Sequence, residues 1–352
     1  MAMKKPKVLM IGPARSVHGG ISGVVNNYYE AGLDEKIELC YIGTMVEGSK
    51  LRKLFQAMLA LAVFLVKVPG YEIVHVNVAS DASYVRKSVF IRVAKYFGKK
   101  IVIHQHGGDF EGYYYEQLDE KGRQSVRKIL SMGDAFLVLA PAYKELFEKI
   151  TGRKDILVFP DSIEIPAVYE KEYGQKKILF LGRLCEAKGV RELLKAMDEV
   201  HLRFPDARLY LGGIWEDKQL KELAAERSDY VTYIGWVSGE KKKKYLKESD
   251  IFVLPSYFEG QSVAILEAMA YSCGIVASDI GGIPQMITEG QTGILIQPKD
   301  ADSLKQGLEK LLADEEFCRR LGEEAREKVE KEFSIEQNMK QLMEVYEQVL
   351  QK

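Results

Sequence analysis

Glu259 and Glu267 are two carboxylates eight residues apart, on either side of the start of an expected helix. An apolar run at 251–254 comes just before them, and the first N–H groups of a helix lack intrahelical partners, which suits a phosphate. Carboxylates accept hydrogen bonds from hydroxyls, so the pair suits an elongated polyhydroxylated ligand. The alternative is a capping acid followed by a solvated acid, although Glu267 has apolar neighbours on both sides. The candidate residues at the helix start are Gly260, Gln261, Ser262 and Val263.

The acid pair and a basic segment together resemble a known family. Glu259 and Glu267 match the E-x7-E signature of family 4 glycosyltransferases, which are retaining enzymes of the GT-B fold. Residues 182–189, directly after an apolar run, resemble the G-R-x4-K-G stretch of that family. The resemblance implies that Arg183 and Lys188 bind the donor diphosphate, where two fixed cations would stabilise the charge on the leaving group. Two plain surface cations at a helix start are the alternative, which conflicts with the helix dipole.

A glycine pair follows the first expected strand and precedes a helix. Its segment, residues 15–23, is not a G-x-G-x-x-G motif, and the next strand ends without an acid placed to hold a ribose. Dinucleotide binding is therefore disfavoured. By resemblance to the family, Gly19 and Gly20 would close over the donor phosphates and sugar. A tight turn is the alternative.

Two groups of possible metal ligands are discounted. We expect the rings of His104 and His106 to point to opposite sides of the extended chain, so that they would not share a metal, and no cysteine stands nearby. The resemblance places His106 near the donor sugar and the attacking acceptor, with a structural histidine as the alternative. Asp300 and Asp302 form the only D-x-D motif, and they precede a helix that Asp is suited to cap. No metal or other cofactor is expected.

Short β-branched and aliphatic runs alternate with helical patterns along the chain, which predicts two doubly wound α/β domains. Residues 1–165 would form an acceptor-side Rossmann-like domain and residues 166–352 a donor-side one, with a final helix at about 335–352 that could pack back on the first domain. Parallel sheets bind ligands outside the carboxyl ends of their strands, so we expect the active site in an interdomain cleft. The expected strands are 8–11, 37–42, 73–78, 101–104, 135–139, 156–159, 177–181, 208–211, 231–234, 251–254, 275–277 and 294–296.

Composition excludes several classes of protein. The 352 residues are 47% hydrophobic and 29% charged, an ordinary globular mixture. The formal charge of -1 provides no general attraction to nucleic acid, and the lysine run 241–244 is interpreted as a solvated helix face. The four cysteines form no CxxC pair, which favours a reducing cytoplasm.

A segment at 54–68 is the most apolar of the chain. Its 15 residues fall short of the roughly 20 that span a bilayer. A buried or half-buried helix is one interpretation, and a surface that meets lipid is the other. Residues 1–165 carry 23 basic and 18 acidic side chains, and Arg86, Lys87 and Arg92 would favour an anionic membrane surface.

The resemblance as a whole implies a retaining, hexosyl-type glycosyltransferase that uses a nucleotide-sugar donor, with a UDP-sugar favoured. The apolar segment suggests a lipid-linked glycan acceptor of cell-surface polysaccharide synthesis, and peripheral contact with the inner face of the membrane. Two other classes stay open. One is a nucleotide-sugar epimerase or sugar phosphorylase of the same fold, and the other is a non-catalytic sugar-nucleotide sensor.

Overall fold

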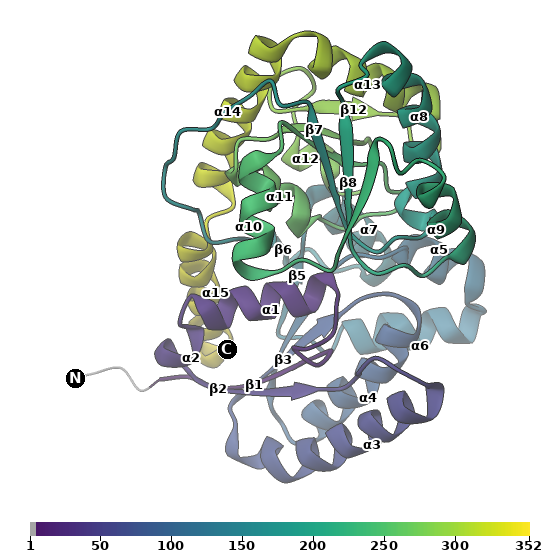
Figure 1. Ribbon diagram of the computed structural model, residues 1–352. Coiled ribbons are helices and arrows are strands. Elements are labelled where there is room, and N and C mark those ends of the chain that lie inside the picture. Colours follow the sequence, from purple (N-terminus) through teal and green to yellow (C-terminus); the bar gives the residue numbers. More distant parts are fainter. Residues whose placement is uncertain (1–4) are drawn as a thin grey trace. The chain divides into compact units, whose positions relative to one another are not determined.

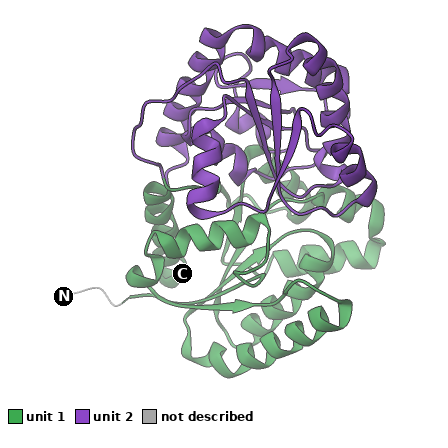
Figure 2. Cartoon of the chain, viewed as in Figure 1, with its two compact units in different colours: residues 1–164, 335–352 green, residues 165–334 purple. Residues whose placement is uncertain are grey.

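The computed structural model describes residues 5–352, and the chain divides into two compact units (Figure 2). Unit 1 contains the chain up to Glu164 together with Ile335–Lys352, and unit 2 contains Ile165–Ser334. The chain therefore enters unit 2 once and returns to unit 1 for its final helix.

Unit 1 is built on a six-stranded parallel sheet in the order β2-β1-β3-β4-β5-β6 (Figure 1). Every residue of the central strand β3 is buried, as expected for a parallel strand covered on both faces. The six strands are β1 (Lys7–Gly12), β2 (Glu38–Gly43), β3 (Ile73–Val78), β4 (Lys100–Gln105), β5 (Ala135–Val138) and β6 (Ile156–Val158).

Helices connect these strands, and the last helix of the chain joins them. Tyr28 donates a hydrogen bond to Asn338 over 3.0 Å, and His75 Nδ1 lies 2.7 Å from the Tyr346 hydroxyl. These buried bonds tie the final helix to the sheet and to the first helix. The helices of unit 1 are α1 (Gly20–Glu30), α2 (Leu33–Lys36), α3 (Lys50–Lys67), α4 (Asp81–Tyr96), α5 (Phe110–Gly112), α6 (Glu120–Leu130), α7 (Pro141–Thr151) and α15 (Ile335–Gln351).

Unit 2 repeats the architecture with a second six-stranded parallel sheet, in the order β12-β11-β10-β7-β8-β9. Its strands are β7 (Lys177–Leu181), β8 (Arg208–Gly212), β9 (Val231–Gly235), β10 (Ile251–Leu254), β11 (Gly274–Ser278) and β12 (Ile294–Ile296). Its helices are α8 (Val190–Arg203), α9 (Lys218–Ala225), α10 (Gly239–Glu248), α11 (Val263–Ala270), α12 (Ile283–Met286), α13 (Ala301–Ala313) and α14 (Glu315–Glu332). The α/β class predicted from sequence is confirmed.

Aspartate side chains begin several of these helices by accepting hydrogen bonds from first-turn backbone N–H groups. Asp300 accepts from the N–H groups of Asp302 and Ser303 at 2.9 and 3.0 Å, so the D-x-D segment caps α13 as predicted. The same arrangement starts four other helices, at Asp109, Asp119, Asp217 and Asp314. Helix α14 ends at Phe333, and a separate helix, α15, begins at Ile335.

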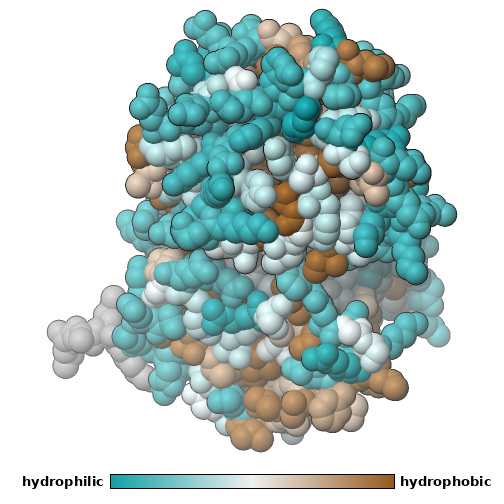
Figure 3. Space-filling view, viewed as in Figure 1, coloured by the Kyte–Doolittle hydropathy of each residue, from teal (hydrophilic) through white to brown (hydrophobic). Residues whose placement is uncertain are grey.

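Helix α3 differs from the other helices because its apolar side chains face solvent. Only Ala60 and Phe64 of its 18 residues are buried. Figure 3 shows apolar side chains gathered at the lower end of the view, where Figure 1 places α3. The helix is half-buried, one of the two forms that the first interpretation allowed, because Ala60 and Phe64 pack into the core of unit 1 and the remaining apolar side chains stay exposed. None of the helices within residues 5–352 forms an apolar span that could cross a membrane. The exposed apolar residues of α3 are Leu51, Leu54, Phe55, Met58, Leu59, Val63, Leu65 and Val66.

Candidate active site

The loops after β7 and β10 meet at the carboxyl edge of the unit 2 sheet. These strands are neighbours in the sheet, so their carboxyl ends share one edge. Tyr257 N–H donates to the Ala187 carbonyl over 2.9 Å. Gly189 has φ +67°, and a Cβ there would lie 2.0 Å from the Pro255 carbonyl oxygen. Only glycine therefore permits this approach, which brings the two predicted donor-binding loops together.

Lys188 and Glu259 form an ion pair in this place. The Lys188 Nζ lies 2.5 Å from Glu259 Oε1, and the Ser256 hydroxyl donates to the same oxygen over 2.8 Å. The two side chains are 18% and 11% exposed. The cation predicted for a phosphate and the carboxylate predicted for a sugar are thus in direct contact.

Arg183 lies on the same loop as Lys188 but makes a different contact. Its Nη1 is 3.2 Å from Glu216 Oε2, and both side chains are about half exposed. Glu216 follows β8, the strand next to β7. Gly213 at the end of β8 has φ +153°, and an added Cβ there would lie 1.7 Å from the Gly182 carbonyl oxygen. This close approach joins the loop that carries Arg183 to the loop that carries Glu216.

Glu267 forms a separate ion pair with Lys242. The distance from Lys242 Nζ to Glu267 Oε1 is 2.5 Å, and the two side chains are 29% and 19% exposed. The lysine run was interpreted as a solvated helix face, and this holds for Lys243 and Lys244, which pair with acids of their own helix. It is wrong for Lys242. Sequence reasoning missed Lys242 because only the folded sheet brings α10 and α11 together.

Helix α11 begins at Val263 and presents its amino end beside Glu259. The Ser262 side chain accepts a hydrogen bond from Ile265 N–H over 3.4 Å, and no acidic side chain stands in the first turn. Glu267 is one turn further along the helix. The phosphate-binding role predicted for Gly260, Gln261, Ser262 and Val263 stays a prediction, supported by a helix start that lacks an acidic side chain of its own.

Gly19 and Gly20 lie at the start of α1 in unit 1. Gly19 is extended, with φ -174°, and an added Cβ at either glycine would meet nothing within 4 Å. Packing within the protein therefore does not require glycine at these two positions. A role in binding the donor stays a prediction.

The expectation that His104 and His106 point to opposite sides is wrong. Side chains two residues apart in a strand share a face, and the two ring centroids lie 3.9 Å apart. The side chain of His106 is 2% exposed, its Nε2 lies 2.8 Å from Asn77 Oδ1, and its Nδ1 lies 3.3 Å from Asp161 Oδ1. In this structure both ring nitrogens face protein groups, so the predicted contact of His106 with substrate stays a prediction.

Several solved structures share this architecture. Sucrose-phosphate synthase from Thermosynechococcus elongatus has a TM-score of 0.82 at 22% identity, with 98% of this chain and 99% of that chain covered. Anabaena HepE, solved in complex with UDP, has a TM-score of 0.75 at 14% identity, with 97% and 100% covered. At these identities the likeness concerns the fold, and the predicted GT-B fold is confirmed.

Sequence relatives point to one family. Alpha-maltose-1-phosphate synthase of Mycolicibacterium smegmatis is 32% identical over 187 residues, or 49% of this chain and 48% of that protein. An uncharacterized glycosyltransferase of Methanocaldococcus jannaschii is 27% identical over 280 residues, or 74% of this chain and 71% of that protein. The chain spans about half the length of several curated relatives that it matches. Residues 161–328 match the family described as glycosyl transferases group 1, which bears out the resemblance over that segment.

Proposed function

We propose that this protein is a retaining, hexosyl-type glycosyltransferase that moves a sugar from a UDP-sugar to an acceptor hydroxyl. The observation that carries the proposal is the Lys188–Glu259 pair, a largely buried cation and carboxylate at the sheet edge where α/β folds bind ligands. One sequence relative and one structural neighbour support the substrate class by their names. One is a maltose-1-phosphate synthase, and Anabaena HepE was solved with UDP-glucose.

The proposed chemistry divides the donor among four side chains. Arg183 and Lys188 hold the diphosphate, Glu259 accepts hydrogen bonds from the donor sugar, and Glu267 accepts them from the ribose. When the diphosphate enters, Lys188 exchanges the Glu259 carboxylate for a phosphate oxygen, which frees Glu259 for sugar hydroxyls. The two cations stabilise the charge that develops on the leaving group. The departing phosphate takes the acceptor proton while the acceptor attacks the same face, so the anomeric configuration is retained.

The proposal includes no metal at the diphosphate, because the two cations supply the positive charge there. The affinity for UDP is therefore expected to be the same with excess chelator as with added Mg²⁺. A requirement for a divalent cation in UDP binding would contradict this part of the proposal.

A lipid-linked acceptor, and with it peripheral contact with a membrane, is proposed from α3. Leu51, Phe55 and Val66 are 80%, 67% and 82% exposed, and Arg52 and Lys53 stand on the same helix. An apolar face with flanking cations suits an anionic lipid surface. Lys87 does not contribute, contrary to the expectation from sequence, because it is only 1% exposed.

A thermal-shift panel of UDP, GDP, ADP and their sugar conjugates tests the donor site. Ligand at 100 times its dissociation constant stabilises by about 2.7 kcal/mol. UDP is expected to raise the midpoint of thermal unfolding of the native protein. The Glu267→Ala variant is expected to lose most of that rise. Glu240→Ala is the matched control, because Glu240 is an 87% exposed side chain that pairs with Lys243 on its own helix. If no nucleotide raises the midpoint of thermal unfolding of the native protein, the proposed donor site is wrong.

Product analysis then separates transfer from the other activities of this fold. A transferase releases UDP from a UDP-sugar at a rate that depends on the acceptor, and the new bond keeps the anomeric configuration of the donor. An epimerase would convert the sugar without an acceptor. A sensor would bind UDP-sugar and turn over neither substrate. Inversion of the anomeric configuration would contradict the proposed mechanism.

A further inference from the structure

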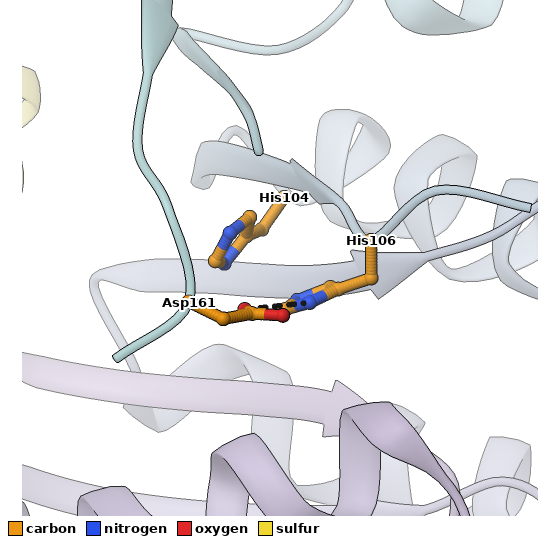
Figure 4. A group of neighbouring side chains, drawn as sticks. All are labelled: His104, His106 and Asp161. Carbon is orange, nitrogen blue, oxygen red and sulfur yellow. Dashed lines mark ion pairs between the residues drawn. The ribbon is translucent and has the colours of Figure 1, made fainter. Parts of the chain in front are cut away.

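His104, His106 and Asp161 form a buried polar cluster in unit 1 (Figure 4). One ligand atom from each side chain lies within 4.8 Å of the other two. His104 is fully buried, and the side chains of His106 and Asp161 are 2% and 5% exposed. None of the roles proposed above uses His104 or Asp161, whereas the family resemblance places His106 near the donor sugar.

The backbone explains why the three side chains meet. His104 lies near the end of β4 and His106 just after it, where His106 N–H donates to the Val78 carbonyl over 2.8 Å. Asp161 follows β6, two strands away in the same sheet. Figure 4 shows both rings directed toward the Asp161 carboxylate. The argument from opposite-facing rings that disfavoured a shared metal therefore does not apply.

The hydrogen bonds of Asn77 determine which nitrogen of His106 carries hydrogen. Asn77 Nδ2 donates to the Ile11 carbonyl over 3.1 Å, so Asn77 presents Oδ1 to His106 Nε2 at 2.8 Å. Nε2 must then be the donor. The other nitrogen, Nδ1, faces Asp161 Oδ1 at 3.3 Å, and a lone pair there would repel the carboxylate. A positive species must lie between them, either a proton or a metal ion.

His104 distinguishes these two possibilities. The Phe159 backbone approaches its ring, but neither ring nitrogen completes a hydrogen bond of normal geometry. A proton on His106 would satisfy Asp161 but leave at least one buried nitrogen of His104 without a hydrogen-bond partner, which is costly. A metal ion would bond His104, His106 and Asp161 together.

We propose that His104, His106 and Asp161 bind one divalent transition-metal ion, with Zn²⁺ as the best match. Two imidazoles and one carboxylate are a common ligand set for Zn²⁺, and they leave a fourth position for water. Asn77 acts as the outer hydrogen-bond acceptor that orients His106. The ion would join the end of β4 to the segment after β6. It is separate from the donor diphosphate, which needs no metal in the proposed function.

The test uses the full chain without a histidine tag, dialysed against a chelator and then titrated with ZnCl2 or CoCl2. Equilibrium dialysis is expected to give one ion per chain, and bound Co²⁺ is expected to show the visible spectrum of a low-coordinate nitrogen and oxygen site. Asp161→Asn and His104→Gln are expected to lose at least 100-fold in affinity. Asn77→Ala is expected to lose about 10- to 100-fold, the effect typical of outer hydrogen-bond partners.

Two other histidines provide matched controls. His18 pairs with Glu47 at the surface, and His201 stacks on Tyr230 in unit 2. His18→Gln and His201→Gln are expected to bind the ion as the native chain does. If the cluster variants fail to fold, imidazole NMR signals of the native chain decide the question, because Zn²⁺ should shift those of His104 and His106 and leave that of His18 in place. A native chain that binds neither ion, or binding that all variants retain, overturns the proposal in favour of a buried imidazolium–carboxylate pair.

Discussion

Lys188 is the side chain whose replacement should most directly separate a donor site from a structural ion pair. Removing it takes away a phosphate partner worth about 1.5–3 kcal/mol, the range for hydrogen bonds to charged groups. Lys188→Met is therefore expected to weaken UDP binding about 10- to 100-fold by calorimetry. Lys195→Met on the exposed face of α8 is the control. Equal affinities of the two variants for UDP would mean that Lys188 forms a structural ion pair with Glu259 and does not bind the phosphate.

A second residue makes stability depend on pH. Burial first, and then the nearby Arg86 charge, lower the pKa of Lys87 from 10.5 to about 7. Its Nζ donates to the Ser83 hydroxyl over 2.9 Å. The unfolded chain keeps the proton up to about pH 10.5, whereas the folded chain loses it near pH 7. The free energy of unfolding should therefore rise with pH across this window, and fall as pH drops toward 7.

Lys87→Met removes the cost of burying an amine that is protonated in the unfolded chain, and the methionine side chain fills most of the same space. The variant is expected to be more stable than the native chain at pH 7, by up to about 5 kcal/mol at about 1.4 kcal/mol per pKa unit. The difference should shrink toward pH 10. Urea unfolding at several pH values measures it, with Lys95→Met on the exposed face of α4 as the control. If the difference in stability between the two chains stays constant across pH, the pKa of Lys87 is not lowered by burial.

At the scale of elements, α3 carries the prediction of membrane contact. Phe55 and Met58 are 67% and 62% exposed on this helix. Burying a side chain of this size in lipid gains about 1.5–3 kcal/mol, so Phe55→Glu with Met58→Glu should lower binding to anionic vesicles at least tenfold. Sedimentation with phosphatidylglycerol vesicles at low salt measures this. Leu202→Glu, at an 83% exposed position on α8, should leave binding unchanged. Undiminished binding of the α3 double variant would contradict the prediction.

At the scale of the whole molecule, the chain should unfold in two steps because it forms two units. Tyr346 on α15 is fully buried in unit 1, so Tyr346→Ala should destabilise that unit by about 3–5 kcal/mol. Both tryptophans, Trp215 and Trp236, lie in unit 2. Tryptophan fluorescence should keep the native midpoint, while circular dichroism should show an earlier first step. Tyr346→Phe, which loses the hydrogen bond between the hydroxyl and His75 but keeps the ring, is the milder control. A joint shift of both signals would mean that the units unfold together.

The alternation of strands and helices could be predicted from the amino-acid sequence, and so could the positions of the acid pair and the basic segment. These features depend on residues close in the chain. Apolar runs such as 251–254 indicate buried strands. Asp300 could be predicted to cap a helix because a cap contacts only backbone groups within one turn. The family resemblance depended on the same short segments.

Which charges meet, and which apolar faces stay exposed, could not be predicted from the sequence, because both depend on segments that lie far apart in the chain. Lys188 reaches Glu259 and Lys242 reaches Glu267 because the parallel sheet brings together loops and helices that are far apart in the chain. A helical pattern does not state what covers its apolar face, so the exposure of α3 could not be derived from it. Likewise, the contact of His106 with Asp161 joins two strand ends that only the order of the sheet makes neighbours in space.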